Sequence, residues 1–103
     1  MSCGCPDSMR DMSGSGPRAV MWNGVWQSMK IAAAADAHEV NVAPHNFYGH
    51  LCTMMNAHFA AAVPNLRIME TDIDRIAWDQ ELFTHVPEYV DGHLVLSDRP
   101  GWG

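Results

Sequence analysis

His45 and Glu70 are the two residues of this 103-residue chain whose types and positions best suit chemistry. His45 follows the mostly apolar run 40–44, and Glu70 follows the run 66–69. The stretch between the runs has helical periodicity, so the order is strand, helix, strand, and parallel strands need such a crossover. Proteins built from repeated strand–helix units carry their chemistry at the carboxyl ends of the strands. We therefore expect the imidazole and the carboxylate to share one rim.

This pair of groups suits acid–base chemistry. An imidazole can take or return a proton near neutral pH, and a carboxylate can accept or share one. Together they fit proton abstraction beside a carbonyl or carboxylate. Nucleophilic catalysis is not expected, because no Ser or Cys stands beside His45. Asn46 and Tyr48, in the loop that His45 opens, are candidate substrate-binding residues, and the sequence leaves open whether they touch a ligand.

Two helices and two short strands are expected to position these residues. Helical periodicity predicts helices over 24–38 and 50–62, while 40–43 and 66–69 are predicted strands and 19–21 the stub of another. The apolar stripe expected on the first helix comprises Trp22, Val25, Trp26, Met29, Ala32 and Ala33. The stripe expected on the second comprises Leu51, Met54, Met55, Phe59, Ala62 and Val63.

After Glu70 the sequence changes character. Residues 71–83 are acidic and polar, which indicates a long surface excursion. Asp91-Gly92 lies between apolar runs within 89–96 and is a strong hairpin signal. The last residues, 98–103, are rich in Pro and Gly and predict coil.

Composition narrows the function classes. The length allows one domain, and 48% hydrophobic residues argue against disorder throughout. The net charge is −6 and the six Lys and Arg are scattered, so nucleic acid is not an expected partner. A membrane is not expected either, because no apolar run approaches the ~20 residues of a spanning helix. Three Cys suit a reducing, cytoplasmic setting, and the Gly/Ser-rich residues 1–18 are predicted to be a loose leader.

The His and Cys residues do not predict a metal site. Cys3-Gly4-Cys5 lacks the two-residue gap of common zinc motifs. His50 and His58 are eight positions apart on the second predicted helix, about 12 Å at the standard rise, which is too far for one ion. His45, Cys52 and His85 match no known ligand spacing.

Six sequence blocks, in order, carry a resemblance that covers about residues 20–103. They are Trp22-Asn23-Gly24, Lys30-Ile31-Ala32, Val42-Ala43-Pro44-His45-Asn46, Ile68-Met69-Glu70, Asp91-Gly92-His93-Leu94 and Pro100-Gly101-Trp102-Gly103. They resemble the C-terminal part of mandelate racemase/muconate-lactonizing family proteins of the enolase superfamily, and within it the acid-sugar dehydratases.

The resemblance implies a fold and roles for the two chemical residues. The fold would be α/β, the last helix–strand units of a (β/α) barrel over 19–103, followed by a C-terminal hairpin and coil. His45 would be the acid/base that removes the proton alpha to an acid-sugar carboxylate. Glu70 would hydrogen-bond a substrate carboxylate oxygen. The full-length family binds Mg²⁺ through three carboxylates on earlier strands, which stabilises the charge that develops.

The chain also departs from that pattern. The metal-binding strands have no counterpart in it, and the Asp that pairs with the His in relatives aligns with Ala19. We therefore expect no Mg²⁺ on this chain alone, and we expect self-association through open sheet edges and an uncovered apolar face. Residues 1–18 resemble nothing in the family. Two interpretations stay open: a fragment of an Mg²⁺-dependent dehydratase or racemase, or a catalytically inactive truncated chain that is inert or docks with a separate N-terminal part.

Overall fold

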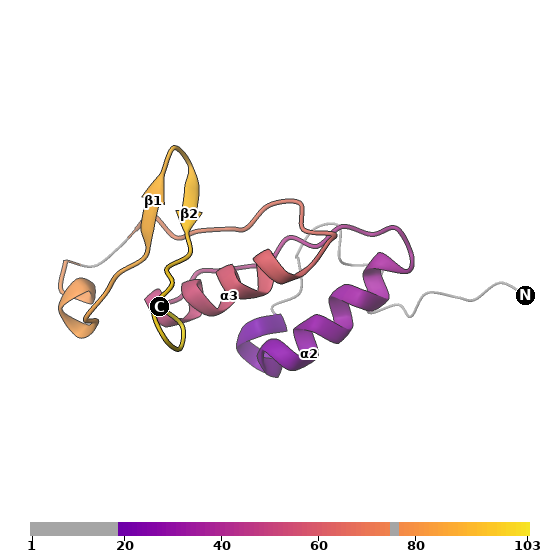
Figure 1. Cartoon of the computed structure of the whole chain (residues 1–103), viewed down its shortest axis with the longest axis horizontal. Coiled ribbons are helices and arrows are strands. Elements are labelled where there is room, and N and C mark those ends of the chain that lie inside the picture. Colours follow the sequence, from indigo (N-terminus) through magenta and orange to yellow (C-terminus); the bar gives the residue numbers. More distant parts are fainter. Residues whose placement is uncertain (1–18, 75–76) are drawn as a thin grey trace, which may run out of the picture.

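The computed structural model of the chain describes residues 19–74 and 77–103 (Figure 1). Its elements are helices α2 (Ala19–Asp36) and α3 (His50–Ala62), the 3-10 helix η2 (Asp79–Leu82), and strands β1 (Glu88–Val90) and β2 (His93–Val95). The predicted leader 1–18, with Cys3-Gly4-Cys5, lies outside the described residues. No helix in the described part is both long and apolar enough to cross a bilayer.

Helix α2 begins earlier than the sequence pattern indicates and contains a kink. Residues 19–21 are helical, so the predicted strand stub is wrong; Ala and Met there favour a helix. The kink falls at Gly24, whose φ of 69° and ψ of 169° suit only glycine. The Ser28 hydroxyl, fully buried, donates to the Gly24 carbonyl at 2.9 Å. That bond satisfies a backbone acceptor beside the kink, so a bent helix replaces the predicted strand and straight helix.

The buried faces of α2 and α3 differ from the predicted apolar stripes. On α2, Ala32 and Ala35 are buried while Trp26 is 72% exposed, with the Lys30 ammonium 5.1 Å from the centre of its ring. On α3, Leu51 is 51% exposed, and the buried face comprises His50, Thr53, Asn56, Ala57 and Phe59. The two helices pack against each other (Figure 1), with Ala32 and Ala35 of α2 and Phe59 of α3 in the shared core.

The two predicted strands that precede His45 and Glu70 run parallel, as expected. Val42 and Leu66 form a parallel bridge. The Val42 N–H donates to the Asn65 carbonyl at 2.8 Å, and the Arg67 N–H donates to the Val42 carbonyl at 2.9 Å. The pairing stays a single bridge rather than two regular strands, because Pro44 has no N–H to continue the ladder. This short pairing still fixes the relative register of the two segments.

A small core lies between the helices and the bridge. It consists of Ala32, Ala35, Val42, Phe59 and Val63. Asn65, 7% exposed, closes one side of this core, because its side-chain amide donates to the Ala32 carbonyl at 3.1 Å and to the Val40 carbonyl at 2.9 Å. One amide thus ties the end of α2 to both parallel segments.

The C-terminal region forms the predicted hairpin. Strands β1 and β2 pair antiparallel with Tyr89 opposite Leu94, and the turn residues Asp91 and Gly92 have φ of 48° and 76°. Positive φ at both positions is the type I′ geometry that matches the twist of a hairpin. The hairpin prediction is confirmed. The residues after β2 return to α3 (Figure 1). There the Trp102 ring meets the ring of His58, in the second half of that helix.

Candidate acid–base site

His45 and Glu70 meet at the end of the parallel pair. The Glu70 backbone N–H donates to the Pro44 carbonyl at 3.3 Å. Because His45 follows Pro44 directly, this bond places Glu70 beside His45. His45 Nδ1 and Glu70 Oε2 are in direct contact. The side chains are 33% and 49% exposed, so a solute can reach them. The expectation of a shared rim is confirmed; the roles expected for the two residues stay predictions.

The pairing decides which nitrogen of His45 is available. An ionised carboxylate only accepts hydrogen bonds, so Nδ1 is the atom that carries the hydrogen shared with Glu70. A carboxylate on one ring nitrogen fixes the tautomer and the orientation of the ring. The other nitrogen, Nε2, is then the one that can take a proton from a ligand or return it.

Asn46 reaches this pair through its backbone. Its N–H donates to Glu70 Oε2 at 2.9 Å, so one carboxylate oxygen contacts two consecutive residues. Its side chain is fully buried, with 0% exposure, and its amide nitrogen donates to Thr53 Oγ1 of α3 at 3.0 Å. The loop thus folds the Asn46 side chain against α3, and its role in substrate binding stays a prediction.

Tyr48 lies beside the imidazole. Its ring meets the His45 ring edge-on, with centroids 5.9 Å apart and an interplanar angle of 85°. This contact limits how the His45 ring can rotate. Tyr48 is half-buried, and its role in substrate binding stays a prediction.

Thr53 is the residue of this site that the sequence analysis missed. It is fully buried, and its hydroxyl lies 3.0 Å from the Asn46 amide nitrogen and 3.4 Å from the Gly49 carbonyl. A signal was present, because Thr53 and Asn56 are polar residues three apart among the apolar residues of one helix. The apolar stripe alone cannot reveal that the polar positions face inward.

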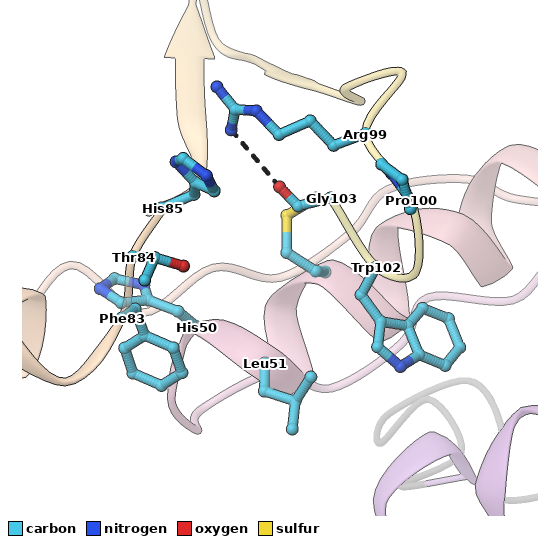
Figure 2. Close-up of a pocket in the computed structure, with 10 residues that line it drawn as sticks. His50, Leu51, Phe83, Thr84, His85, Arg99, Pro100, Trp102 and Gly103 are labelled. Atoms are coloured by element: carbon cyan, nitrogen blue, oxygen red, sulfur yellow. Dashed lines mark hydrogen bonds between the residues drawn. The ribbon is translucent and has the colours of Figure 1, made fainter.

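Two pockets lie away from this site. One of about 400 Å³, at the start of α3, is shown in Figure 2, with His50, Leu51 and Trp102 among its lining residues. The Arg99 guanidinium there points to the Gly103 carbonyl, 3.5 Å away. The second, of about 420 Å³, lies between α3 and the hairpin. Neither His45 nor Glu70 lines these two pockets.

The described residues do not fit a magnesium ion. Mg²⁺ prefers octahedral coordination by oxygen ligands, usually one or two carboxylates with waters. Within residues 19–74 and 77–103 no three His, Cys, Asp or Glu side chains come together as a metal group. At the candidate site the Glu70 carboxylate is already paired with the His45 imidazole, a donor set that suits a proton better than this cation.

A comparison with known protein families identifies the family of this chain. Residues 11–103 match the family described as Enolase C-terminal domain-like. The chain therefore belongs to this family, and the resemblance read from the six blocks is confirmed. The match begins at residue 11, inside the range 1–18 that was predicted to be a leader.

Three relatives show how close the kinship is. D-xylonate dehydratase of Haloferax volcanii is 32% identical over 80 residues, 78% of this chain and 19% of its own. A Burkholderia xenovorans crystal structure named "putative L-alanine-DL-glutamate epimerase" has a TM-score of 0.77 at 82% identity, covering 80% of this chain and 21% of that one. A mandelate racemase/muconate lactonizing enzyme of Jannaschia sp. CCS1 has a TM-score of 0.68 at 31% identity, covering 78% and 20%.

These relatives are much longer than this chain, which spans about a fifth of their length. A further structure under the Burkholderia name holds magnesium and fumarate. Together with the two helices and the parallel bridge, the family match confirms the predicted α/β fold, a part of a (β/α) barrel with a C-terminal hairpin. The kinship with dehydratases and racemases of the enolase superfamily is confirmed as well.

Proposed function

We propose that this chain supplies the acid–base part of an Mg²⁺-dependent enzyme that removes the proton alpha to a carboxylate. The observation that carries the proposal is the contact of His45 Nδ1 with Glu70 Oε2 at the ends of two parallel segments. His45 is the acid/base residue, acting through Nε2. Glu70 holds His45 through Oε2, and its other oxygen is the one that would hydrogen-bond a substrate carboxylate oxygen when a proton is shared between them.

The chemical step moves one proton and one electron pair. The C–H bond alpha to the substrate carboxylate breaks, the proton passes to Nε2 of His45, and the electron pair moves into the carboxylate. In a dehydration, His45 then returns the proton to the departing beta-hydroxyl, which leaves as water. In a racemisation, a proton is returned to the alpha carbon from the other face. The charge that develops on the substrate carboxylate needs stabilisation. The described residues do not form a metal site, so groups other than these must supply that stabilisation.

The names of the relatives suggest acid sugars as the substrate class. D-xylonate, in the name of the Haloferax relative, has an alpha C–H and a beta-hydroxyl beside its carboxylate, which are the groups that this step requires. A dipeptide of L-alanine and glutamate, in the Burkholderia name, has an alpha C–H but no beta-hydroxyl. Both compounds can lose the alpha proton, but only D-xylonate can then lose water. Comparing them therefore distinguishes a dehydratase from an epimerase.

A chimera provides the test. Residues 19–103 would replace the matching segment of the Burkholderia protein, and proton exchange alpha to the carboxylate of each compound would be followed by NMR in D₂O with Mg²⁺. The chimera should exchange, and His45→Asn should slow exchange by about 10²- to 10⁴-fold, the usual share of general acid–base catalysis. His85→Asn, an exposed histidine remote from Glu70, is the matched control and should leave the rate unchanged. A His45→Asn chimera as fast as the parent would contradict the proposal.

The second candidate is a catalytically inactive chain that is inert or docks with a separate N-terminal part or with itself. It is favoured by the exposure of large apolar side chains, 72% for Trp26 and 66% for Ile68. Ile68 follows the parallel bridge and lines the pocket between α3 and the hairpin, and exposed apolar patches promote association. Sedimentation equilibrium should show a mass that rises with concentration, and Ile68→Lys should reduce the rise. A monomer at all concentrations would exclude self-association.

A further inference from the structure

Asn46 links His45 and Glu70, here called the acid–base pair, to the buried Thr53 of α3. Glu70 Oε2 contacts His45 Nδ1 and accepts from the Asn46 N–H at 2.9 Å. Where that N–H points depends on the loop 45–49, which has no regular secondary structure of its own. Asn46 and Gly49 of this loop both bond to α3, and both bonds end on Thr53.

The Thr53 hydroxyl sits between these two loop residues. It accepts from the Asn46 side-chain amide at 3.0 Å, and it lies 3.4 Å from the Gly49 carbonyl, which also receives the Thr53 backbone N–H at 3.2 Å. Thr53 and Asn46 are both 0% exposed, so water cannot replace these partners without opening the structure. Buried polar groups that lose a partner carry a desolvation cost, which makes this contact directional and stiff.

We propose that the buried Asn46–Thr53 hydrogen bond positions Glu70, and through it the tautomer of His45, for proton transfer. Asn46 and Thr53 are positioning residues in this proposal, since their buried side chains bond to each other and not to the His45 ring or the Glu70 carboxylate. The Asn46 side chain fixes the loop, the loop aims the backbone N–H at Glu70 Oε2, and the carboxylate keeps the hydrogen of His45 on Nδ1. This inference rests on the proposed function of His45, which it deepens.

The 103-residue chain labelled with ¹⁵N allows a direct test by NMR. In the wild type, the Asn46 amide proton should move downfield as Glu70 ionises, and in Glu70→Gln this movement should disappear. The ring ¹⁵N signals of His45 should report hydrogen on Nδ1 in its neutral form. An Asn46 amide that ignores the ionisation of Glu70 would overturn the proposal without any variant of Asn46 or Thr53, so it stays testable if those variants fail to fold.

Variants at Thr53 test the coupling. Thr53→Val keeps the shape and removes the hydroxyl, and it should lower the ratio of Nδ1–H to Nε2–H tautomer at His45 by roughly tenfold, the size of one hydrogen bond. Thr53→Ser keeps the hydroxyl and should restore the wild-type ratio. Thr84→Val makes the same change at an exposed threonine and should leave the ratio unaltered. A wild-type ratio in a folded Thr53→Val would contradict the proposal.

The outcome is separable from that of the proposed function. The tautomer is read from the ring of His45 and requires no substrate and no turnover. If the His45→Asn chimera keeps its activity while the Thr53 variants shift the tautomer, the proposed function fails and the positioning contact stands as a structural one. If the reverse is found, His45 acts without support from Asn46 and Thr53, and only this inference fails.

Discussion

The helical region, residues 24–70, and the C-terminal region, residues 77–103, are held together in different ways. Every hydrophobic residue of the described part that is fully buried lies in the helical region, between Ala32 and Val63. In the C-terminal region both hairpin strands are largely exposed, with Leu94 alone half-buried in them. The first region therefore depends on burial and buried hydrogen bonds, while the second depends on its turn and on a few contacts with α3.

Those contacts with α3 involve two histidines. The His50 ring packs edge-on against Phe83 at 5.1 Å between centroids, and the His58 ring against Trp102 at 5.5 Å. His58 Nε2 also lies 3.3 Å from the Trp102 carbonyl. The two histidines that lie eight positions apart thus serve as attachment points for the C-terminal region. The acid–base pair, in contrast, sits wholly within the helical region.

The largest expected difference between the regions concerns aromatic side chains. Phe59 is 1% exposed in the core, and Phe59→Ala should reduce the free energy of unfolding by about 3–5 kcal/mol. Tyr89 is 46% exposed in β1, and Tyr89→Ala should reduce it by less than about 1 kcal/mol. Urea unfolding followed by circular dichroism measures both. Equal losses of unfolding free energy would show that the hairpin contributes as much to stability as the core does. The two regions would then not be held together in different ways.

Asn65 tests whether buried hydrogen bonds stabilise the helical region as much as apolar packing does. Asn65→Ala leaves the Ala32 and Val40 carbonyls without the side-chain donor that each has now, and should cost about 2–3 kcal/mol. Asn41 is exposed one residue before the bridge, and Asn41→Ala is the matched control, with an expected change within about 0.5 kcal/mol. The same urea titration applies. Two equal and small losses would mean that water replaces the Asn65 amide.

Two glycines with positive φ allow a sharper comparison, because the same substitution can be made in each region. Gly24 (φ 69°) and Gly92 (φ 76°) both have open space around a new Cβ, so alanine is opposed by backbone strain alone, about 1–3 kcal/mol. Gly24→Ala should lower the global unfolding midpoint. Gly92→Ala should leave that midpoint unchanged and should speed amide hydrogen exchange only in β1 and β2. If Gly92→Ala lowers the midpoint equally, the two regions unfold as one unit.

The sequence predicts the features that depend on local signals or strand ends. The hairpin follows from Asp91-Gly92, two residues that accept positive φ. The meeting of His45 and Glu70 follows from the strand–helix–strand order, since parallel segments end at one edge. These inferences need no knowledge of what packs against what, and both agree with the structure.

The features that the sequence does not predict depend on partners far along the chain. The apolar periodicity of α2 and α3 marks an apolar face, but Trp26 and Leu51 on that face are exposed within the described residues. Thr53 faces inward because Asn46 supplies a hydrogen-bond partner from the preceding loop. Residues 19–21 form a helical segment before the kink at Gly24, which a run of three residues cannot reveal. Periodicity identifies which side chains are alike, whereas contact decides which of them are buried.

The smallest expected effect is on the reactivity of Cys52, in the first turn of α3. Burial raises the pKa of this thiol, so at a given pH it carries less thiolate than an unfolded cysteine does. The thiolate is the reactive form, so iodoacetamide should modify Cys52 several-fold more slowly, up to roughly tenfold, in the folded chain than in urea. Because the pKa is raised, the rate in the folded chain should climb at higher pH than the rate in urea. Mass spectrometry of peptides separates Cys52 from Cys3 and Cys5.

Phe59→Ala should bring the rate close to that in urea, since Cys52 and Phe59 belong to one helix, whereas Tyr89→Ala should not. Equal rates in buffer and in urea for the wild type would mean that α3 opens readily, and the helical region would then be no firmer than the hairpin.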